Sequence, residues 1–145
     1  MLSARIRRLR ASVQLPEYQT PGAAGFDLAA SEDVVVAPHA IALVPTGLVI
    51  AVPDGYFLGV FARSSTPLRR GLIVSNGVGV IDSDYCGATD EIKIQVLNVT
   101  GEPVTVRTGD RIAQGLFIPV ARASWVETNE DLRDGSRGGF GATGG

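Results

Sequence analysis

The stretch Asn76-Gly77-Val78-Gly79-Val80-Ile81-Asp82-Ser83-Asp84-Tyr85 (NGVGVIDSDY) begins with a tight-turn dipeptide that separates two short apolar runs. Asn-Gly accepts the positive φ angles of a two-residue turn, so the pattern predicts a β-hairpin. Glycines in such a turn leave backbone N–H and C=O groups open to a ligand, because no side chains block the approach. The stretch predicts either a ligand-binding hairpin or, as the plainer alternative, an ordinary hairpin followed by an aspartate turn.

Two side chains in this stretch have chemistry that a site could use. Asn76 can offer a donor and an acceptor to the edge of a base. Asp82 follows an apolar run, where a carboxylate could be held in position to orient a water molecule. Both are candidate site residues.

The same alternation of apolar runs and turn formers continues along all 145 residues. Pro53-Asp54-Gly55 predicts a turn, because proline presets φ and glycine accepts a positive φ. Short strands at such spacing are typical of an all-β sandwich or barrel, which is the fold class that we expect. The predicted strands include 34–36, 41–44, 48–52, 56–61, 72–74, 78–81, 92–99, 104–106 and 112–120.

One short helix is expected within this β-rich chain. Ser64 or Ser65 can cap its N-terminus, and Gly71 follows Arg70 as its C-terminal stop. The 18 glycines and 8 prolines exclude a long helical bundle.

The composition limits the functions that the chain can serve. The formal net charge is −2 and twelve of the thirteen basic residues are arginine, which excludes a general nucleic-acid-binding face but allows an arginine-lined anion pocket. A single cysteine and a single histidine exclude a disulfide framework and paired-histidine metal sites. No apolar run approaches membrane-spanning length and no signal peptide is evident, so we expect no membrane partner and a cytoplasmic location.

The composition changes toward the C-terminus, and we expect a β domain over residues 1–128 and an arm over 129–145. The last part of the arm is rich in glycine, so it cannot bury enough surface to offset its ordering entropy. Arg137 could meet a phosphate and Phe140 could stack on a base. The arm is therefore expected to be flexible and to order on a ligand, the alternative being a disordered chain end.

Three further segments have weak signals when each is taken alone. Asp27 lies among apolar neighbours, where a carboxylate needs partners, so it is either part of a hydrated-cation site or an ordinary strand-edge aspartate. Arg63-Ser64-Ser65 before the helix could bind an anion or simply cap that helix. In GDRIAQ, residues 109–114, Asp110 and Arg111 could form a structural pair and Gln114 could contact a ligand.

Taken together and in order, the segments AGFDL, ARSS, NGVGVIDSDY, GDRIAQ and RGGFGATG resemble the trimeric deoxyuridine triphosphate nucleotidohydrolases, the dUTPases. They cover nearly the whole chain. The resemblance implies a jelly-roll-like β subunit and a homotrimer with active sites at the subunit interfaces, each closed by a C-terminal arm. It also implies that dUTP is hydrolysed with Mg²⁺ to dUMP and pyrophosphate, which limits uracil in DNA and supplies dUMP for dTMP synthesis.

The resemblance assigns roles to individual residues. By position, Asp82 matches the acid that orients the attacking water, and Asp27 matches the acid that contacts the water shell of the metal. Tyr85 matches the aromatic ring under the deoxyribose, where a 2′-hydroxyl would clash. The implied substrate contacts are Asn76, Gly79, Val80 and Ile81 for uracil, Arg63, Ser64, Ser65 and Gln114 for phosphates, and Arg137, Phe140, Gly141 and Thr143 from the arm.

The chain departs from the family pattern at a few positions. Ser65 stands where glycine is common, Ala142 stands where serine is common, and residues 88–90 add a short insertion after Tyr85. Two alternative functions stay open from sequence alone. A dCTP deaminase-related enzyme would need a catalytic glutamate after the hairpin, and Glu91 is the nearest candidate. A non-enzymatic β-sandwich binding module with a glycine-rich linker is the second.

Overall fold

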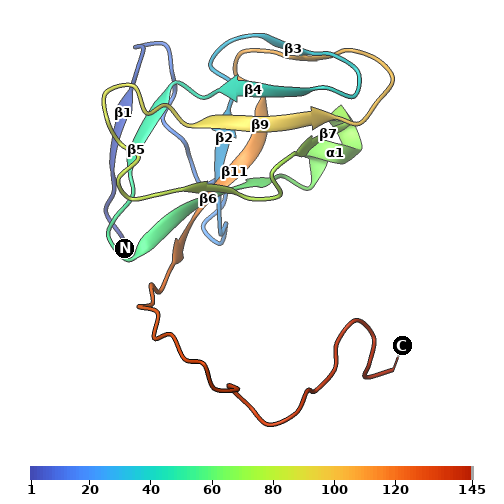
Figure 1. The fold of residues 1–145 in the computed structure, drawn as a ribbon. Helices are drawn as coiled ribbons and strands as arrows, with labels where there is room; N and C mark the ends of the chain where they lie inside the picture. Colours follow the sequence, from blue (N-terminus) through green and yellow to red (C-terminus); the bar gives the residue numbers. More distant parts are fainter. Residues whose placement is uncertain (145) are drawn as a thin grey trace.

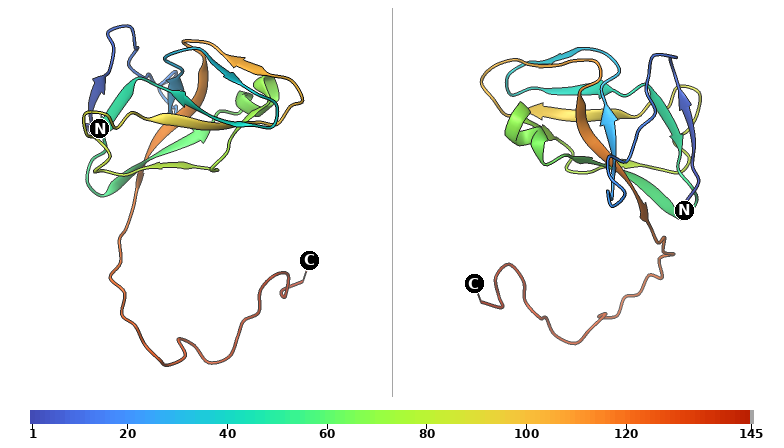
Figure 2. Two further views of the ribbon diagram at one scale, coloured as in Figure 1. Left: turned by 45° about the horizontal axis from the view of Figure 1, so that its top comes forward. Right: turned by 180° about the vertical axis from the view of Figure 1, so that it is seen from behind.

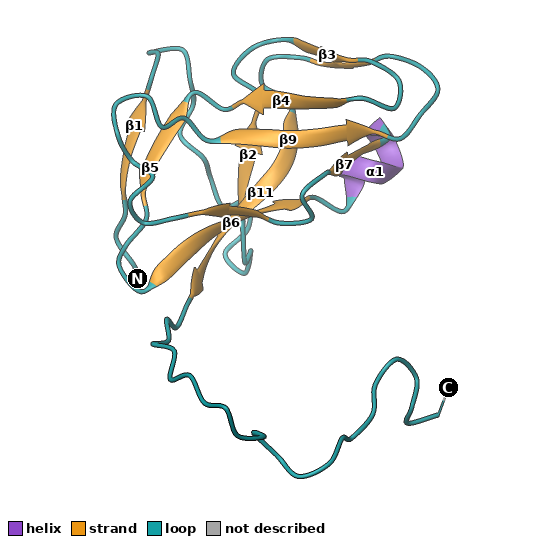
Figure 3. Ribbon diagram, viewed as in Figure 1, coloured by secondary structure: helices purple, strands orange, loops and turns teal. Residues whose placement is uncertain are grey.

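The structure, a computed structural model, describes residues 1–144 and consists of a β body with a long C-terminal tail (Figure 1). Strands make up nearly all of the regular structure, with one short helix beside them (Figure 3). The elements are β1 (Arg5–Arg8), β2 (Phe26–Ala29), β3 (Val34–Val36), β4 (Ile41–Pro45), β5 (Leu48–Ala51), β6 (Tyr56–Ala62), α1 (Ser65–Arg70), β7 (Leu72–Val74), β8 (Gly79–Ile81), β9 (Lys93–Asn98), β10 (Val104–Val106) and β11 (Arg111–Pro119).

The strands form sandwich-like sheets rather than a closed barrel. A four-stranded sheet has the order β2-β11-β6-β8, and a three-stranded sheet has the order β4-β9-β7. The pairs β3–β10 and β1–β5 complete the body, and every pairing is antiparallel. This arrangement agrees with the expected jelly-roll-like all-β class.

A single apolar core lies between the sheets, and alternation along the strands explains how it forms. In β9, Ile94 and Val96 are fully buried while Lys93 is exposed, because successive side chains point to opposite faces. The largest fully buried side chains are Leu28, Ile50, Leu58, Leu72, Ile92, Ile94, Ile112, Val36, Val44, Val60, Val96 and Val106.

The turn at Asn76-Gly77 forms, but the predicted hairpin is wrong. Gly77 has φ 73°, and its N–H donates to the Val74 carbonyl at 3.0 Å. However, β7 pairs with β9, and β8 pairs with β6. The turn therefore crosses between two sheets: Leu72 and Val74 before it are buried in the core, whereas Val78 and Val80 after it are exposed.

Helix α1 matches the predicted position but not the predicted cap. Ser64 occupies the N-cap position, yet its side chain makes no capping hydrogen bond. Thr66 instead fixes the start of the helix to its surroundings: its hydroxyl accepts from the Arg63 N–H, just before the helix, at 3.1 Å and donates to the Ile112 carbonyl at 2.8 Å. Gly71 ends the helix in the left-handed conformation with φ 63°, as predicted.

After Pro119 the chain leaves the body. Residues 120–144 contain no helix or strand, and their side chains are exposed. The views in Figure 2 show this tail projecting from one end of the body. Within residues 1–144, no helix is long and apolar enough to cross a membrane.

Candidate active site

Asp27 lies at the centre of an arginine-rich cluster. Its side chain is only 12% exposed, and both carboxylate oxygens are paired. Arg63 Nε lies 2.8 Å from Oδ1, and Arg111 Nη1 lies 3.0 Å from Oδ2. The need for partners that the sequence predicted is therefore met by two guanidinium groups.

Strand register brings these groups together from distant parts of the sequence. Asp27 on β2 pairs in register with Gln114 on β11, and Gln114 also pairs with Phe61 on β6. Arg63 follows directly after β6, so it projects beside the same part of the sheet. The Gln114 amide donates to the Ala62 carbonyl at 3.1 Å, which holds that side chain against the end of β6.

The expected pairing of Asp110 with Arg111 is wrong. Asp110 pairs with Arg70 at 2.7 Å, and Arg111 turns to Asp27. The hydrogen bond from Arg70 lowers the pKa of Asp110, and the Arg107 N–H acts in the same direction against partial desolvation. A bulge between Arg111 and Ala113 shifts the register of β11 against β2 at this point, and the sequence pattern gave no sign of it.

A positively charged cavity of about 530 Å³ adjoins this cluster. Four arginines and one aspartate line it, which suits a polyanionic ligand. Arg69, Arg70 and Arg111 were not among the predicted site residues. Two signals could have pointed to Arg111: its place in GDRIAQ, and the need of the Asp27 carboxylate for partners. The lining residues are Arg63, Ser65, Arg69, Arg70, Gly109, Asp110 and Arg111.

Asp82 and Tyr85 lie in a second region, at the other end of β6. Asp82 directly follows β8 and is exposed, and none of the side-chain hydrogen bonds found between residues 1–144 involves its carboxylate. The Tyr85 hydroxyl donates to the Glu91 carbonyl at 3.1 Å. Ile81, just before Asp82, pairs with Leu58, and Arg63 lies five residues further along that chain. At the usual strand rise this is about 16 Å.

The predicted uracil-contacting residues flank this second region. Asn76 and Val80 are exposed, and Gly79 packs closely on β6. A Cβ on Gly79 would lie 3.0 Å from the Val60 Cβ, so a larger residue there would push β8 away from β6. The turn thus presents its backbone at the surface with little side-chain cover.

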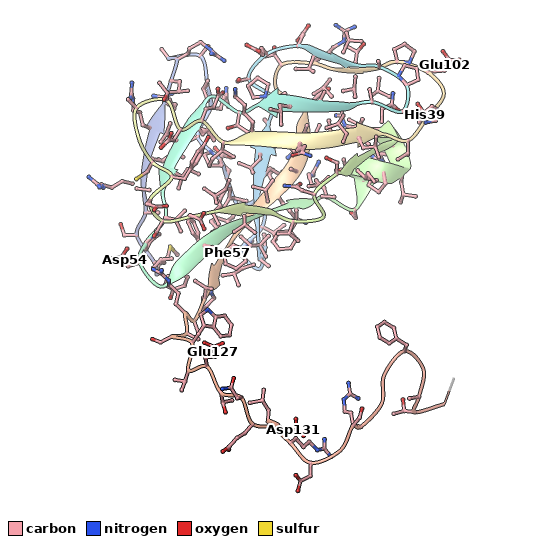
Figure 4. All side chains as sticks on the ribbon, viewed as in Figure 1. His39, Asp54, Phe57, Glu102, Glu127 and Asp131 are labelled. Atoms are coloured by element: carbon pink, nitrogen blue, oxygen red, sulfur yellow. The ribbon has the colours of Figure 1, made fainter. Side chains whose placement is uncertain are left out.

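The predicted arm residues lie on the exposed tail, away from both regions of the same chain. Figure 4 shows Glu127 and Asp131 on the tail, beyond the body that holds Phe57 and Asp54. The four predicted contacts, Arg137, Phe140, Gly141 and Thr143, follow further along this tail and are all exposed.

The donor set is suited to a metal ion that arrives with its ligand. Within the described residues, no three His, Cys, Asp or Glu side chains gather closely enough to hold an ion. Mg²⁺ commonly keeps several waters and is held by one or two carboxylates together with substrate phosphates. Asp27, whose arginine partners line the cationic cavity, is the carboxylate of this cluster that such an arrangement would use.

Comparison with known proteins identifies the family. The family model for dUTPase matches residues 11–144. The chain belongs to the dUTPase family. Its relatives are named deoxyuridine 5′-triphosphate nucleotidohydrolase, so the chain is a dUTP diphosphatase. This result favours the hydrolase over the deaminase-related enzyme and the non-enzymatic binding module.

Two of these dUTPase relatives cover nearly the whole chain. The deoxyuridine 5′-triphosphate nucleotidohydrolase of Thermobifida fusca is 48% identical over 97% of this chain and 78% of that protein. The enzyme of the same name from Helicobacter pylori strain Shi470 is 39% identical over 99% of this chain and 97% of that protein.

Solved dUTPase structures agree with the fold. The crystal structure of the Streptococcus mutans dUTPase has a TM-score of 0.76 and 35% identity, covering 83% of this chain and 98% of that chain. The Staphylococcus bacteriophage 80alpha dUTPase with dUPNHPP has a TM-score of 0.87, 22% identity and 99% coverage of both chains, and it supports the fold alone.

Proposed function

We propose that this dUTP diphosphatase builds each active site from several copies of the chain, in a homotrimer. The separation along β6 carries this proposal. Leu58, the β6 partner of Ile81 next to Asp82, lies about 16 Å of strand rise from Arg63, too far for Asp82 and the Arg63–Asp27 cluster of one chain to serve one reacting phosphate. A second copy could bring its arginine cluster next to Asp82.

Asp82 is the proposed base. It orients a water molecule and accepts its proton as the water oxygen attacks the α-phosphorus. The bond from the α-phosphorus to the bridging oxygen breaks, and pyrophosphate leaves. General-base assistance of this kind contributes about 10²–10⁴-fold in rate. Its exposed position at the end of β8 leaves the carboxylate open to such a water.

The arginine-lined cavity is the proposed phosphate site. Arg63 and Ser65 line this cavity, Ser64 and Gln114 adjoin it in the chain and the sheet, and all four are the proposed phosphate contacts. Arg111 adds a cation that the sequence analysis did not assign. Guanidinium groups form paired hydrogen bonds to phosphate and stabilise charge that develops in the transition state. Mg²⁺, when bound, neutralises phosphate charge and fixes phosphate geometry, and Asp27 would hold it through water.

Selectivity for uracil and for deoxyribose is assigned to the second region. Asn76 and the backbone of Gly79, Val80 and Ile81 read the uracil edge, and close approach of this backbone excludes the thymine methyl group. Cytosine would leave buried backbone groups without partners. Tyr85 packs under the sugar and excludes a 2′-hydroxyl.

The tail is the proposed cover for the site. The span from Val120 to Arg137 is 17 residues, which can reach about 55 Å when extended. Arg137, Phe140, Gly141 and Thr143 could therefore close over a site on a neighbouring copy. The substrate is a soluble nucleotide, so we also propose a cytoplasmic location.

The deciding test is pyrophosphate release from four nucleotides with Mg²⁺. We expect turnover of dUTP to be far faster than that of UTP, dTTP or dCTP. Equal rates for dUTP and UTP would exclude the assigned role of Tyr85, and ammonia release from dCTP would favour the deaminase alternative.

The shared site has its own test. Asp82→Asn and Arg63→Ala chains should each be inactive alone, yet regain part of the activity when unfolded together and refolded as a mixture. Light scattering should give the mass of three chains. A mixture that stays inactive, although mixed trimers form, would contradict the shared site.

A further inference from the structure

The loop after β8 is joined to the body by hydrogen bonds at Glu91. The Tyr85 hydroxyl donates to the Glu91 backbone carbonyl at 3.1 Å. The Glu91 side chain in turn accepts a hydrogen bond from the Gly47 N–H, at 2.7 Å from Oε1. Glu91 thus connects Tyr85 to the turn between β4 and β5.

The receiving turn is buried and closely packed. Gly47 has φ 70°, and a Cβ there would lie 2.4 Å from Val13 Cγ2, so no side chain fits. The buried Thr46 hydroxyl donates to the Ile92 carbonyl at 2.6 Å, and the Ile92 N–H donates to the Leu48 carbonyl at 2.8 Å. The Ile92 N–H belongs to the peptide that carries the Glu91 carbonyl, so the bond to Leu48 holds that peptide to β5, and the Thr46 bond holds the next peptide.

The insertion at residues 88–90 closes on itself between Tyr85 and Glu91. The Gly87 N–H donates to Asp90 Oδ2 at 2.7 Å, and the Asp90 N–H donates to the Gly87 carbonyl at 3.2 Å. The Glu91 N–H then donates to the Thr89 carbonyl at 2.9 Å. The extra residues thus form a separate turn and leave the Tyr85–Glu91 contact intact.

We infer that Glu91 is a positioning residue that sets the Tyr85 ring against the β4–β5 turn and thereby sets the preference for 2′-deoxyribose over ribose. This inference rests on the proposed role of Tyr85 under the sugar. A carboxylate that accepts from a buried N–H forms a short, charge-assisted hydrogen bond, which suits it to fix a loop. Loss of this bond would let the ring move and admit the 2′-hydroxyl.

The test compares kcat and KM for dUTP and UTP in matched variants. Glu91→Ala removes the acceptor, Glu91→Asp keeps the charge but shortens the reach, and Glu91→Gln keeps an acceptor oxygen at the right length. Tyr85→Phe removes the hydroxyl at the other end of the link. Glu102→Ala, at an exposed turn residue, is the control.

We expect the ratio of kcat/KM for dUTP to that for UTP to fall about three- to tenfold in Glu91→Ala, Glu91→Asp and Tyr85→Phe, the range expected for one lost hydrogen bond. The change should appear mainly as a lower KM for UTP. Glu91→Gln and Glu102→Ala should keep the ratio of the unmodified enzyme.

Each outcome separates this inference from the function on which it rests. If Tyr85→Ala leaves the ratio unchanged, the role of Tyr85 fails, and the inference fails with it. If Tyr85→Ala lowers the ratio but Glu91→Ala and Glu91→Asp do not, the inference alone is overturned. A lower thermal unfolding midpoint with an unchanged ratio would make Glu91 a purely structural residue and would also overturn it.

Discussion

Asp82 is exposed at the end of β8, and its proposed task depends on its negative charge. Asp82→Asn keeps the shape of the side chain but cannot accept the proton of the water. We expect kcat to fall by about 10²–10⁴-fold, while calorimetry with a non-cleavable dUTP analogue still detects binding. Asp84→Asn, two residues away in the same loop, should keep most of the rate. Full turnover by Asp82→Asn would exclude it as the base.

Asp110 links stability to pH through its bond with Arg70. Its pKa in the folded protein is lower than the ordinary value of 3.8. The stabilisation is therefore fully present above that ordinary value and is lost as pH falls through the lower pKa of the folded state. We expect Asp110→Asn to lower the free energy of unfolding by about 1 kcal/mol at pH 7, with no difference below the folded pKa. Urea unfolding across acid pH measures this, and a gap that is independent of pH would contradict it.

Single residues show where sequence reasoning was sufficient and where it stopped. An aspartate among apolar neighbours had to have partners, and Asp27 has them. Which partners it has was not predictable, because the bulge after Arg111 changes the side to which that side chain turns. From the sequence alone, the expected partner of Arg111 was therefore Asp110, its neighbour in the chain.

Among the elements, α1 ends at a closely packed glycine. Gly71 has φ 63°, and a Cβ there would lie 2.3 Å from Thr100 Cγ2. We expect Gly71→Ala to lower the free energy of unfolding by at least about 1 kcal/mol, because an L side chain is strained at positive φ. Gly101→Ala is a suitable control, since nothing lies within 4 Å of its would-be Cβ. Equal denaturation midpoints for the two variants would contradict this prediction.

Most strand positions were predicted from the sequence, whereas the arginine-rich β1 and the strand partners were not. The runs at 34–36, 72–74 and 104–106 coincide with β3, β7 and β10, because branched apolar residues between turn formers have few other conformations. The partner of a strand depends on contacts far away in sequence. The Asn76-Gly77 turn formed as expected, yet its two strands joined different sheets.

For the whole molecule, the tail is the clearest target for a truncation. Residues 120–144 are exposed and outside the core, so removing the chain from Gly135 onward should leave the thermal unfolding midpoint and the trimeric state unchanged. Turnover of dUTP should be lost, since Arg137 and Phe140 are removed. A truncated protein that sediments as a monomer would instead make the tail an assembly element.

The five motifs allowed the family to be recognised from the sequence, and the dUTPase relatives confirm that resemblance. What the motifs did not reveal is their division between two ends of one strand. That division follows from the register of β6 with β8, which depends on the folded sheet as a whole.

The ion pairs at Asp27 have a consequence for how the enzyme responds to ionic strength. Arg63 and Arg111 together with Asp27 present one net positive charge in the resting cluster rather than two. The KM for dUTP should therefore rise less steeply with added salt than it would in a site with two unpaired guanidinium groups. Pyrophosphate should also dissociate faster than it would from such a site. Neutralising the Asp27 carboxylate would make the cavity bind the product pyrophosphate more tightly.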